Sequence, residues 1–291
     1  MIITEKQMTE ADAHYIDAPH SGAAFHLSGA LIRLGKKVVS LKESESTPKN
    51  PLPIFEAEDF SSNALMHGNL RVAFFCADTF LGKNDRPSET YLEDIQSKAT
   101  TLQKNNPECR IVFLLPKNIV ASQLKKIRSD FPTSTVFISP ALYGFRDGGF
   151  FTRLLEESKS IFPNWKTKHI HCDLLFYSDA IGFLVSAIEQ EKAKGKLLEL
   201  PYNTQSPTEV VIEFKKHFSR GNGFGSLVSS LLKAPTDTQL NPSAFEYTQV
   251  DQALKYFPNA IKSVERSLKE CSRQYKNNPN QKMHFPPSKA P

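Results

Sequence analysis

Apolar runs in the first half of the chain alternate with segments in which apolar residues recur every three or four positions. Short apolar runs predict strands, and the second kind of spacing predicts helices that pack one face on a sheet. Arg71–Ala77 and Arg110–Leu115 are continuously apolar after their first residue, as in parallel strands covered on both faces. The predicted strands are His14–Asp17, Lys37–Leu41, Ile54–Glu56, Arg71–Ala77, Arg110–Leu115 and Thr135–Ile138, and the predicted helices are Gly22–Leu34, Ser61–His67, Ser88–Asn105 and Asn118–Phe131. This alternation predicts an α/β protein with a doubly wound parallel sheet.

Beyond Pro140 the regular alternation of strand and helix patterns ends, and predicted helices are mixed with short extended segments. The helices predicted there are Gly149–Ser160, Asp179–Lys194, Thr208–Phe218 and Ala260–Tyr275. We therefore expect a sheet-forming domain over residues 1–140 and a smaller mixed lobe over 141–275, interleaved with the sheet. The polar segment 276–291, rich in proline towards its end, is expected to be a flexible tail.

Composition narrows the class of protein. The net charge of +5 comes from 36 basic and 31 acidic residues that are spread along the chain, so nucleic acid is not the expected partner. Four cysteines lie far apart without a C-x-x-C pair, and the histidine pair His169 and His171 has no third ligand nearby. We expect neither a disulfide framework nor a metal site. Without a secretory leader or an apolar run of membrane length, the predicted location is the cytoplasm, with no membrane partner.

Four segments of the second half carry a family resemblance. They are ISPALYGFRDGG (Ile138–Gly149), FYSDAIGFLVSAIE (Phe176–Glu189), QSPTEVVIEFKKHF (Gln205–Phe218) and DQALKYFPNAIKSVERSL (Asp251–Leu268). In this order and spacing they resemble the extended short-chain dehydrogenase/reductase family, of the NAD-dependent epimerase/dehydratase type. The resemblance spans residues 12–275 and implies a Rossmann-like sheet of six or seven strands. It also implies a substrate cleft, for which Tyr143, Arg146 and Asp179 are the candidates.

The family's phosphate-binding turn, T-G-x-x-G-x-x-G, is altered in this chain. Ala18, Ser21 and Ala24 stand at the three glycine positions, so methyl and hydroxymethyl groups occupy the space that the phosphates need. Pro19 offers no N–H group. The resemblance thus implies that an NAD molecule in the family's pose is strained here. Ser21 and His20 still stand at a helix N-terminus, which can bind an anion.

Three residues are candidates for the adenosine half of a nucleotide. Lys42 follows the second strand, at the position where the family has an acidic residue that binds the ribose. Two alternatives are open: the lysine binds a 2′-phosphate, or it is a solvated side chain at the end of a strand. Asp59 and Phe60 match a pair in the family, an aspartate followed by an apolar residue, that contacts the adenine ring. The alternative for Asp59 is that it caps the short helix that follows.

The catalytic pair of the family is missing. Its Y-x-x-x-K motif aligns with Ile119 at the tyrosine and Gln123 at the lysine, and no tyrosine in the chain has a lysine four residues later. Because neither an alkyl nor an amide side chain can transfer a proton at neutral pH, the family's mechanism requires groups that these positions lack.

These observations favour a non-catalytic member of the family, a pseudoenzyme that serves as a ligand-sensing or protein-interaction module. The alternative is an active NAD(P)-dependent oxidoreductase or sugar-nucleotide epimerase/dehydratase with relocated catalytic residues. We expect no cofactor, with NAD or NADP as the open alternative. The partner is expected to be a protein or a small-molecule ligand, and the helices at 88–105 and 118–131 match the pair through which the family forms homodimers.

Overall fold

A computed structural model describes residues 13–19, 22–42, 52–61, 65, 70–77, 89–144, 173–204, 250–257, 259 and 261–277. Its main feature is an eight-stranded sheet in the order β3-β2-β1-β4-β5-β6-β9-β11, in which every neighbouring pair is parallel. The strands are β1 (Ala13–Ile16), β2 (Lys37–Leu41), β3 (Phe55–Ala57), β4 (Leu70–Cys76), β5 (Arg110–Pro116), β6 (Thr135–Ser139), β9 (Leu197–Glu199) and β11 (Asp251–Gln252). The first six follow the order of a doubly wound dinucleotide-binding sheet, so the predicted fold class is confirmed.

The sheet has more strands than the six or seven expected. Its additional strands β9 and β11 come from the second half of the chain and contain three and two residues. Runs this short carry no readable apolar period. They show that residues beyond 140 complete the main sheet.

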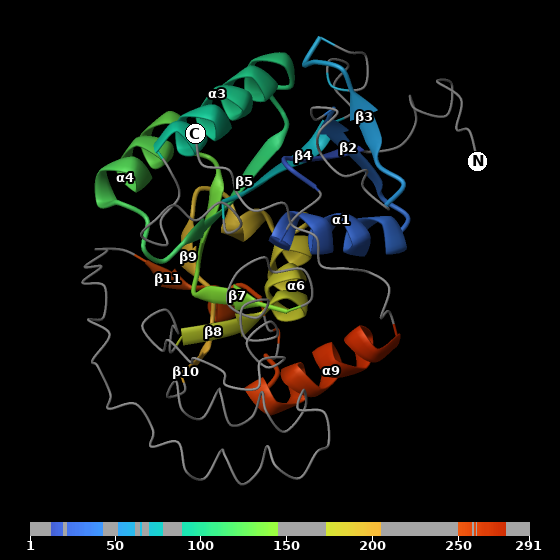
Figure 1. Cartoon of the computed structure of the whole chain (residues 1–291). Helices are drawn as coiled ribbons and strands as arrows, with labels where there is room; N and C mark the ends of the chain where they lie inside the picture. Colours follow the sequence, from blue (N-terminus) through green and yellow to red (C-terminus); the bar gives the residue numbers. More distant parts are fainter. Residues whose placement is uncertain are drawn as a thin grey trace, which may run out of the picture.

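A second, three-stranded sheet lies beside the first (Figure 1). It consists of β7 (Ala141–Tyr143), β8 (Asp173–Phe176) and β10 (Asn203–Thr204), in the order β10-β8-β7. β7 and β8 are parallel, whereas β10 runs antiparallel to β8. All three of its strands come from residues beyond 140.

Helices cover both faces of the main sheet (Figure 1). On one face α1 (Gly22–Arg33) and α6 (Tyr177–Ala187) pack into a core with Phe74, Leu114 and Phe137. On the other face α3 (Glu89–Asn105) and α4 (Ala121–Asp130) pack into a second core with Phe75 and Phe113. Because successive side chains of a strand point to opposite faces of the sheet, the strands contribute residues to both cores.

Several helix boundaries differ from those predicted. α4 begins at Ala121 rather than Asn118, and the predicted helix Asp179–Lys194 is divided into α6 and a 3₁₀ turn, η3 (Glu191–Ala193). η4 (Ala253–Lys255) leads towards α9 (Val264–Asn277), which extends two residues into the predicted tail. The helices predicted at 149–160 and 208–218, and most of that at 61–67, lie outside the described residues.

Candidate ligand site at the carboxyl edge of the sheet

The sheet has a topological switch point between β1 and β4. From β1 the chain builds β2 and β3 on one side and then returns to place β4 on the other, where the Asp17 amide donates to the Phe74 carbonyl at 3.0 Å. In open α/β sheets ligands bind outside the carboxyl ends of the strands at such a point. The ends of β1, β2 and β4 therefore define the first part of the candidate site.

Ala18 stands in the turn that leaves β1 and has a φ of 46°. This left-handed conformation suits glycine, and it costs a residue with a Cβ about 1 kcal/mol or more. The chain thus keeps a glycine-type turn at the first glycine position of the resemblance while placing a methyl group there. His20 and Ser21, the candidates for anion binding, lie outside the described residues, and Gly22 opens α1.

Replacing Ala18 with glycine is expected to raise the free energy of unfolding by about 1 kcal/mol, because relief of the left-handed alanine outweighs the extra freedom of glycine in the unfolded chain. Urea unfolding followed by circular dichroism measures this change. Gly35, with a φ of 72° beyond the end of α1, provides the reverse control, since Gly35→Ala should destabilise the protein. A destabilised Ala18→Gly variant would contradict the strain assigned to this turn.

Asp17, immediately before Ala18, is a site residue that sequence reasoning missed. Its side chain is 4% exposed and accepts hydrogen bonds from Tyr15 Oη at 3.0 Å and Lys98 Nζ at 3.1 Å. Burial raises the pKa of this carboxyl group, although Lys98 opposes the shift. The nearly buried acid borders the turn at Ala18, and its charge is paired with the Lys98 ammonium. The only sequence signal was an acidic residue directly before the altered turn.

The adenosine-side candidates have partners within the protein. Lys42 follows β2 and forms an exposed ion pair with Glu58 at 2.8 Å, which raises the pKa of the lysine. Asp59 accepts hydrogen bonds from the amide and hydroxyl groups of Ser61, so it caps the turn that follows β3. Phe60 packs against Tyr15, with ring centroids 6.1 Å apart.

Ile119 and Gln123 do not share a helix face. Ile119 lies in the turn between β5 and α4, is fully buried in the core below α3 and α4, and donates its amide to the Pro116 carbonyl at 3.0 Å. Gln123 lies in the first turn of α4 and is half-buried. The predicted helix Asn118–Phe131 would place the two residues one turn apart on one face, but α4 begins only after Ile119.

Two of the three substrate-cleft candidates are described, and both have partners within the protein. Tyr143 is buried in β7 against Phe176, with ring centroids 5.7 Å apart. The carboxylate of Asp179, at the start of α6, accepts the Lys262 amide at 2.7 Å and lies 3.8 Å from the Lys262 ammonium, so it holds the segment before α9. Arg146 lies outside the described residues.

A polar cluster that the sequence did not reveal lies at the same edge of the sheet. Lys117 directly follows β5, and its ammonium group contacts Asp173 at 3.2 Å, Glu199 at 3.3 Å and the Tyr202 hydroxyl at 3.2 Å. Partial burial opposes the charge of Lys117, but the hydrogen bonds to Tyr202 and Asp173 outweigh it and raise the pKa of the lysine. We call these four residues the Lys117 cluster. They are separated by up to 85 positions, so no sequence motif joins them.

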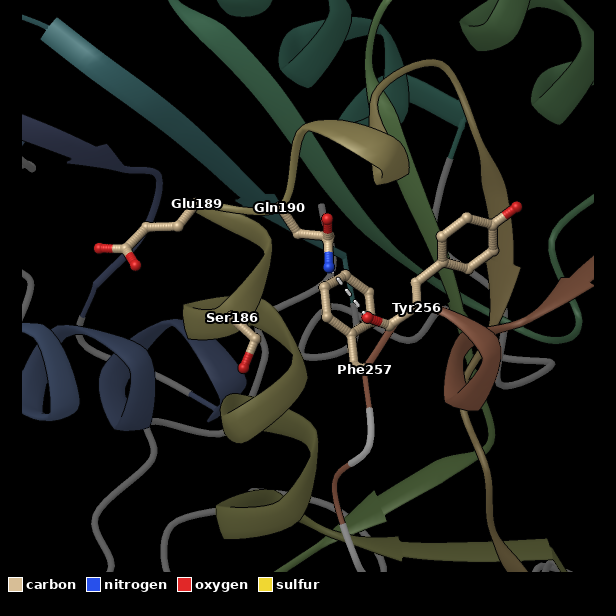
Figure 2. A pocket seen from close by; sticks show the side chains of 5 residues that line it. All are labelled: Ser186, Glu189, Gln190, Tyr256 and Phe257. Atoms are coloured by element: carbon tan, nitrogen blue, oxygen red, sulfur yellow. Dashed lines mark hydrogen bonds between the residues drawn. The ribbon is translucent and has the colours of Figure 1, made fainter.

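A small pocket lies elsewhere. It is lined by Ser186, Glu189, Gln190, Tyr256 and Phe257, and the Gln190 amide donates to the Tyr256 carbonyl at 3.1 Å (Figure 2). The pocket is beside the end of α6, whose last carbonyls are bound by Arg110 at the amino end of β5. It therefore lies away from the strand ends where a ligand is expected. Within the described ranges there is no group of three or more metal-ligating side chains, and no helix has the length and apolar character to span a bilayer.

Comparison with known proteins identifies the fold. No family model matches the sequence, and no curated protein matches it significantly. Among solved structures, Gre2 from Candida albicans in complex with NADPH has a TM-score of 0.60 at 12% identity, covering 91% of this chain and 98% of that one. A UDP-N-acetylglucosamine 4-epimerase from Bacillus cereus has a TM-score of 0.59 at 11% identity, covering 91% and 99%. The ADP-L-glycero-D-manno-heptose-6-epimerase of Helicobacter pylori has a TM-score of 0.60 at 12% identity, covering 95% and 99%.

These similarities extend over nearly the whole of each chain, so they concern the complete architecture and not the sheet alone. At 11–12% identity they carry no information about individual site residues. The chain has the Rossmann-like fold of NAD(P)-dependent reductases and sugar-nucleotide epimerases, as the sequence resemblance implied.

Proposed function

We propose that this protein is a member of the extended short-chain dehydrogenase/reductase family that binds a small ligand without the family's tyrosine–lysine proton transfer, as a ligand-sensing or protein-interaction module. One observation carries the proposal. The position that resembles the catalytic tyrosine is Ile119, which is fully buried in a turn before α4. A reactive group there would face the core, where it could not reach a ligand.

The residues at the switch point fit a dinucleotide poorly. The methyl group of Ala18 fills space at the turn, and Pro19 has no N–H to donate. Lys42 favours a dinucleotide, because its exposed ammonium could exchange Glu58 for a 2′-phosphate at little cost. NADP is therefore the better of the two candidates, and we propose that either binds weakly.

A second candidate function is an active NAD(P)-dependent oxidoreductase or sugar-nucleotide epimerase/dehydratase with relocated catalytic groups. It is supported by the similarity to the NADPH complex of Gre2 and to two epimerases. It is also supported by the Lys117 cluster, which brings a lysine within 3.2 Å of the Tyr202 hydroxyl at the end of β5. This pair, rather than buried Tyr143 or Asp179, is the best candidate for relocated proton transfer.

A turnover assay distinguishes the two functions. Purified protein is incubated with NADPH or NADP and a panel of aldehydes, ketones and UDP-sugars, while nicotinamide absorbance and sugar products are followed. We expect no turnover above buffer. Turnover that is lost in Tyr202→Phe or Tyr143→Phe, with an unchanged melting temperature, would establish the enzyme function instead.

The outward faces of α3 and α4 are candidate partner surfaces. α3 exposes Glu89, Glu93 and Asp94 together with Lys104, and Asp94 pairs with Lys98 at 2.7 Å, whereas α4 exposes Lys125 and Lys126. If these helices form the homodimer, acidic α3 of one copy can face basic α4 of the other, and the association should weaken with salt.

We therefore expect the double variant Lys125→Glu, Lys126→Glu to weaken self-association by about tenfold, a moderate effect because exposed ion pairs each contribute little. Sedimentation equilibrium at low and high salt measures the change. Arg33→Glu, a charge reversal at an exposed position in the last turn of α1 and outside this surface, is the control. Self-association that withstands both salt and the double variant would contradict a charged interface.

A further inference from the structure

We propose that Asp17 is a proton-sensitive latch between the end of β1 and helix α3. As a carboxylate, Asp17 holds the Lys98 ammonium at the strand end, and as a neutral acid it leaves Lys98 to Asp94 on the exposed side of α3. The inference goes beyond the proposed function, because the latch works whether or not a ligand binds at the turn.

Asp17 lies where the central strands meet α3. It directly follows β1, and its amide donates to the Phe74 carbonyl of β4 at 3.0 Å. Its side chain is 4% exposed, and the carboxylate accepts Lys98 Nζ of α3 at 3.1 Å. The two partners are 81 positions apart in the sequence. This ion pair therefore ties the strand end before the altered turn to a helix that covers one face of the sheet.

The two oxygens of the Asp17 carboxylate differ in their bonding. Oδ1 accepts the Tyr15 hydroxyl at 3.0 Å and the Lys98 ammonium at 3.1 Å. Oδ2 is buried and has no hydrogen-bond partner among the residues that the structure describes. A buried anionic oxygen without a donor is costly, and a proton on it removes the charge that burial disfavours. Oδ2 is therefore the atom that takes the proton, while Oδ1 keeps the hydrogen bond from Tyr15.

Lys98 has a second carboxylate on its own helix. Asp94 precedes it by one helical turn, and the Asp94 Oδ2 lies 2.7 Å from Lys98 Nζ. The side chain of Lys98 is 25% exposed and that of Asp94 is 51% exposed, so this pair reaches the surface. The ammonium is thus shared between a buried acid and an exposed one. When the buried acid loses its charge, the exposed acid is the partner that remains.

The charged and titratable groups that face Asp17 come from α3 and from β1 itself. α3 contributes Lys98, Asp94 and Tyr91, and β1 contributes Tyr15, while the neighbouring strands present apolar side chains on this face. Phenols are neutral in the range where carboxyl groups titrate. Burial lowers the pKa of Lys98, but Asp17 and Asp94 outweigh it and raise that pKa, so the lysine stays charged. The charge of this network therefore changes only at its carboxyl groups.

The direction of the Asp17 titration follows from its surroundings. Burial raises the pKa of the carboxyl group, and Lys98 and Tyr15 oppose the shift. Asp17 therefore takes up its proton at a higher pH than an ordinary aspartate, whose pKa is about 3.9. Since the folded state binds this proton more firmly than the unfolded state, the wild type gains stability relative to Asp17→Asn as the pH falls from neutral through the folded pKa. The latch holds at neutral pH and opens over that range.

The experiment follows the full chain, with ¹³C-labelled aspartate, by NMR as the pH is lowered from neutral to about 4. We expect the Asp17 carboxyl carbon to titrate with a midpoint above about 3.9. The backbone amides of the α3 turn from Asp94 to Lys98 should shift with the same midpoint, and this shift should be lost in Asp17→Asn. In Lys98→Met, which removes the opposing charge, the midpoint of Asp17 should rise.

Asp179→Asn is the matched control. Asp179 is another nearly buried acid beside a lysine, but it begins α6 and pairs with Lys262. Its removal should leave the midpoint of Asp17 and the α3 transition unchanged. The melting temperature of each variant, recorded at every pH, shows that the chain stays folded during the titration.

Three results would overturn the latch: an Asp17 midpoint at or below about 3.9, an α3 transition that persists at the same midpoint in Asp17→Asn, or an Asp17 midpoint that Lys98→Met leaves unchanged. The two variants test the latch independently, so if one fails to fold, the other still decides. Failure of the proposed function is distinguishable, because that function is tested by turnover and dinucleotide binding, whereas this titration uses the protein alone.

Discussion

Replacing Ile119 with tyrosine is expected to destabilise the protein by about 3 kcal/mol and to create no catalytic activity. Ile119 is fully buried in a turn between β5 and α4. A larger ring would overpack this core at a cost of about 1–3 kcal/mol, and its hydroxyl would be buried without an assured partner at a further cost of about 1–3 kcal/mol. The melting temperature should fall by roughly 5–10 °C.

The matched control is Gln123→Lys, the other half of the missing pair. Gln123 is half-buried in the first turn of α4, so a lysine there can extend to solvent, and the change should stay within about 0.5 kcal/mol. Differential scanning fluorimetry compares both single variants and the double variant. Two outcomes would show that position 119 still faces a ligand cleft. One is an Ile119→Tyr protein that is as stable as the wild type, and the other is activity in the double variant that requires both substitutions.

Removing the carboxylate of Asp179 by Asp179→Ala is expected to destabilise the protein by about 2–3 kcal/mol. The carboxylate accepts the Lys262 amide at 2.7 Å and lies 3.8 Å from the Lys262 ammonium, while only 6% of the side chain is exposed. A hydrogen bond to a charged group contributes about 1.5–3 kcal/mol, and its removal leaves a donor unsatisfied. Urea unfolding measures the loss.

The Asp179→Asn variant separates structure from chemistry. Its amide oxygen can still accept from Lys262, so it should cost less than Asp179→Ala. Burial raises the pKa of Asp179, although Lys262 opposes the shift. A raised folded pKa means that the folded state holds the proton more firmly than the unfolded state, so the wild type should gain stability relative to Asp179→Asn as the pH falls from neutral through that pKa. Equal stability of the wild type and Asp179→Ala at neutral pH would contradict this tethering role.

The fold could be predicted from sequence because its central strands are long and apolar. β4 and β5 have seven residues each, and their patterns were readable without further context. β9 and β11, with three and two residues, were not predicted, since their pairing depends on neighbours that are distant in the sequence. The start of α4 was placed too early, because the chain after β5 turns tightly through Ile119 before the helix begins.

The site was less predictable than the fold. Alignment to a family motif found the altered turn at Ala18 but could not show its left-handed backbone. The Lys117 cluster depends on side chains that converge from four segments, and composition and spacing carry no signal of it. Asp179 matched a family position, yet its contacts tie the chain together. A match to a family motif therefore predicted where a residue lies better than it predicted what that residue does.

The most direct test of the account is the change in melting temperature caused by NAD and by NADP at about 1 mM. A ligand at about a hundred times its dissociation constant stabilises the folded state by about 2.7 kcal/mol, so a site with a dissociation constant of roughly 10 µM would raise the melting temperature by roughly 5–10 °C. With Ala18 and Pro19 at the turn, we predict a shift below about 1 °C for NAD and a small one at most for NADP. A rise of several degrees with either dinucleotide would contradict the account and support an active cofactor-dependent enzyme.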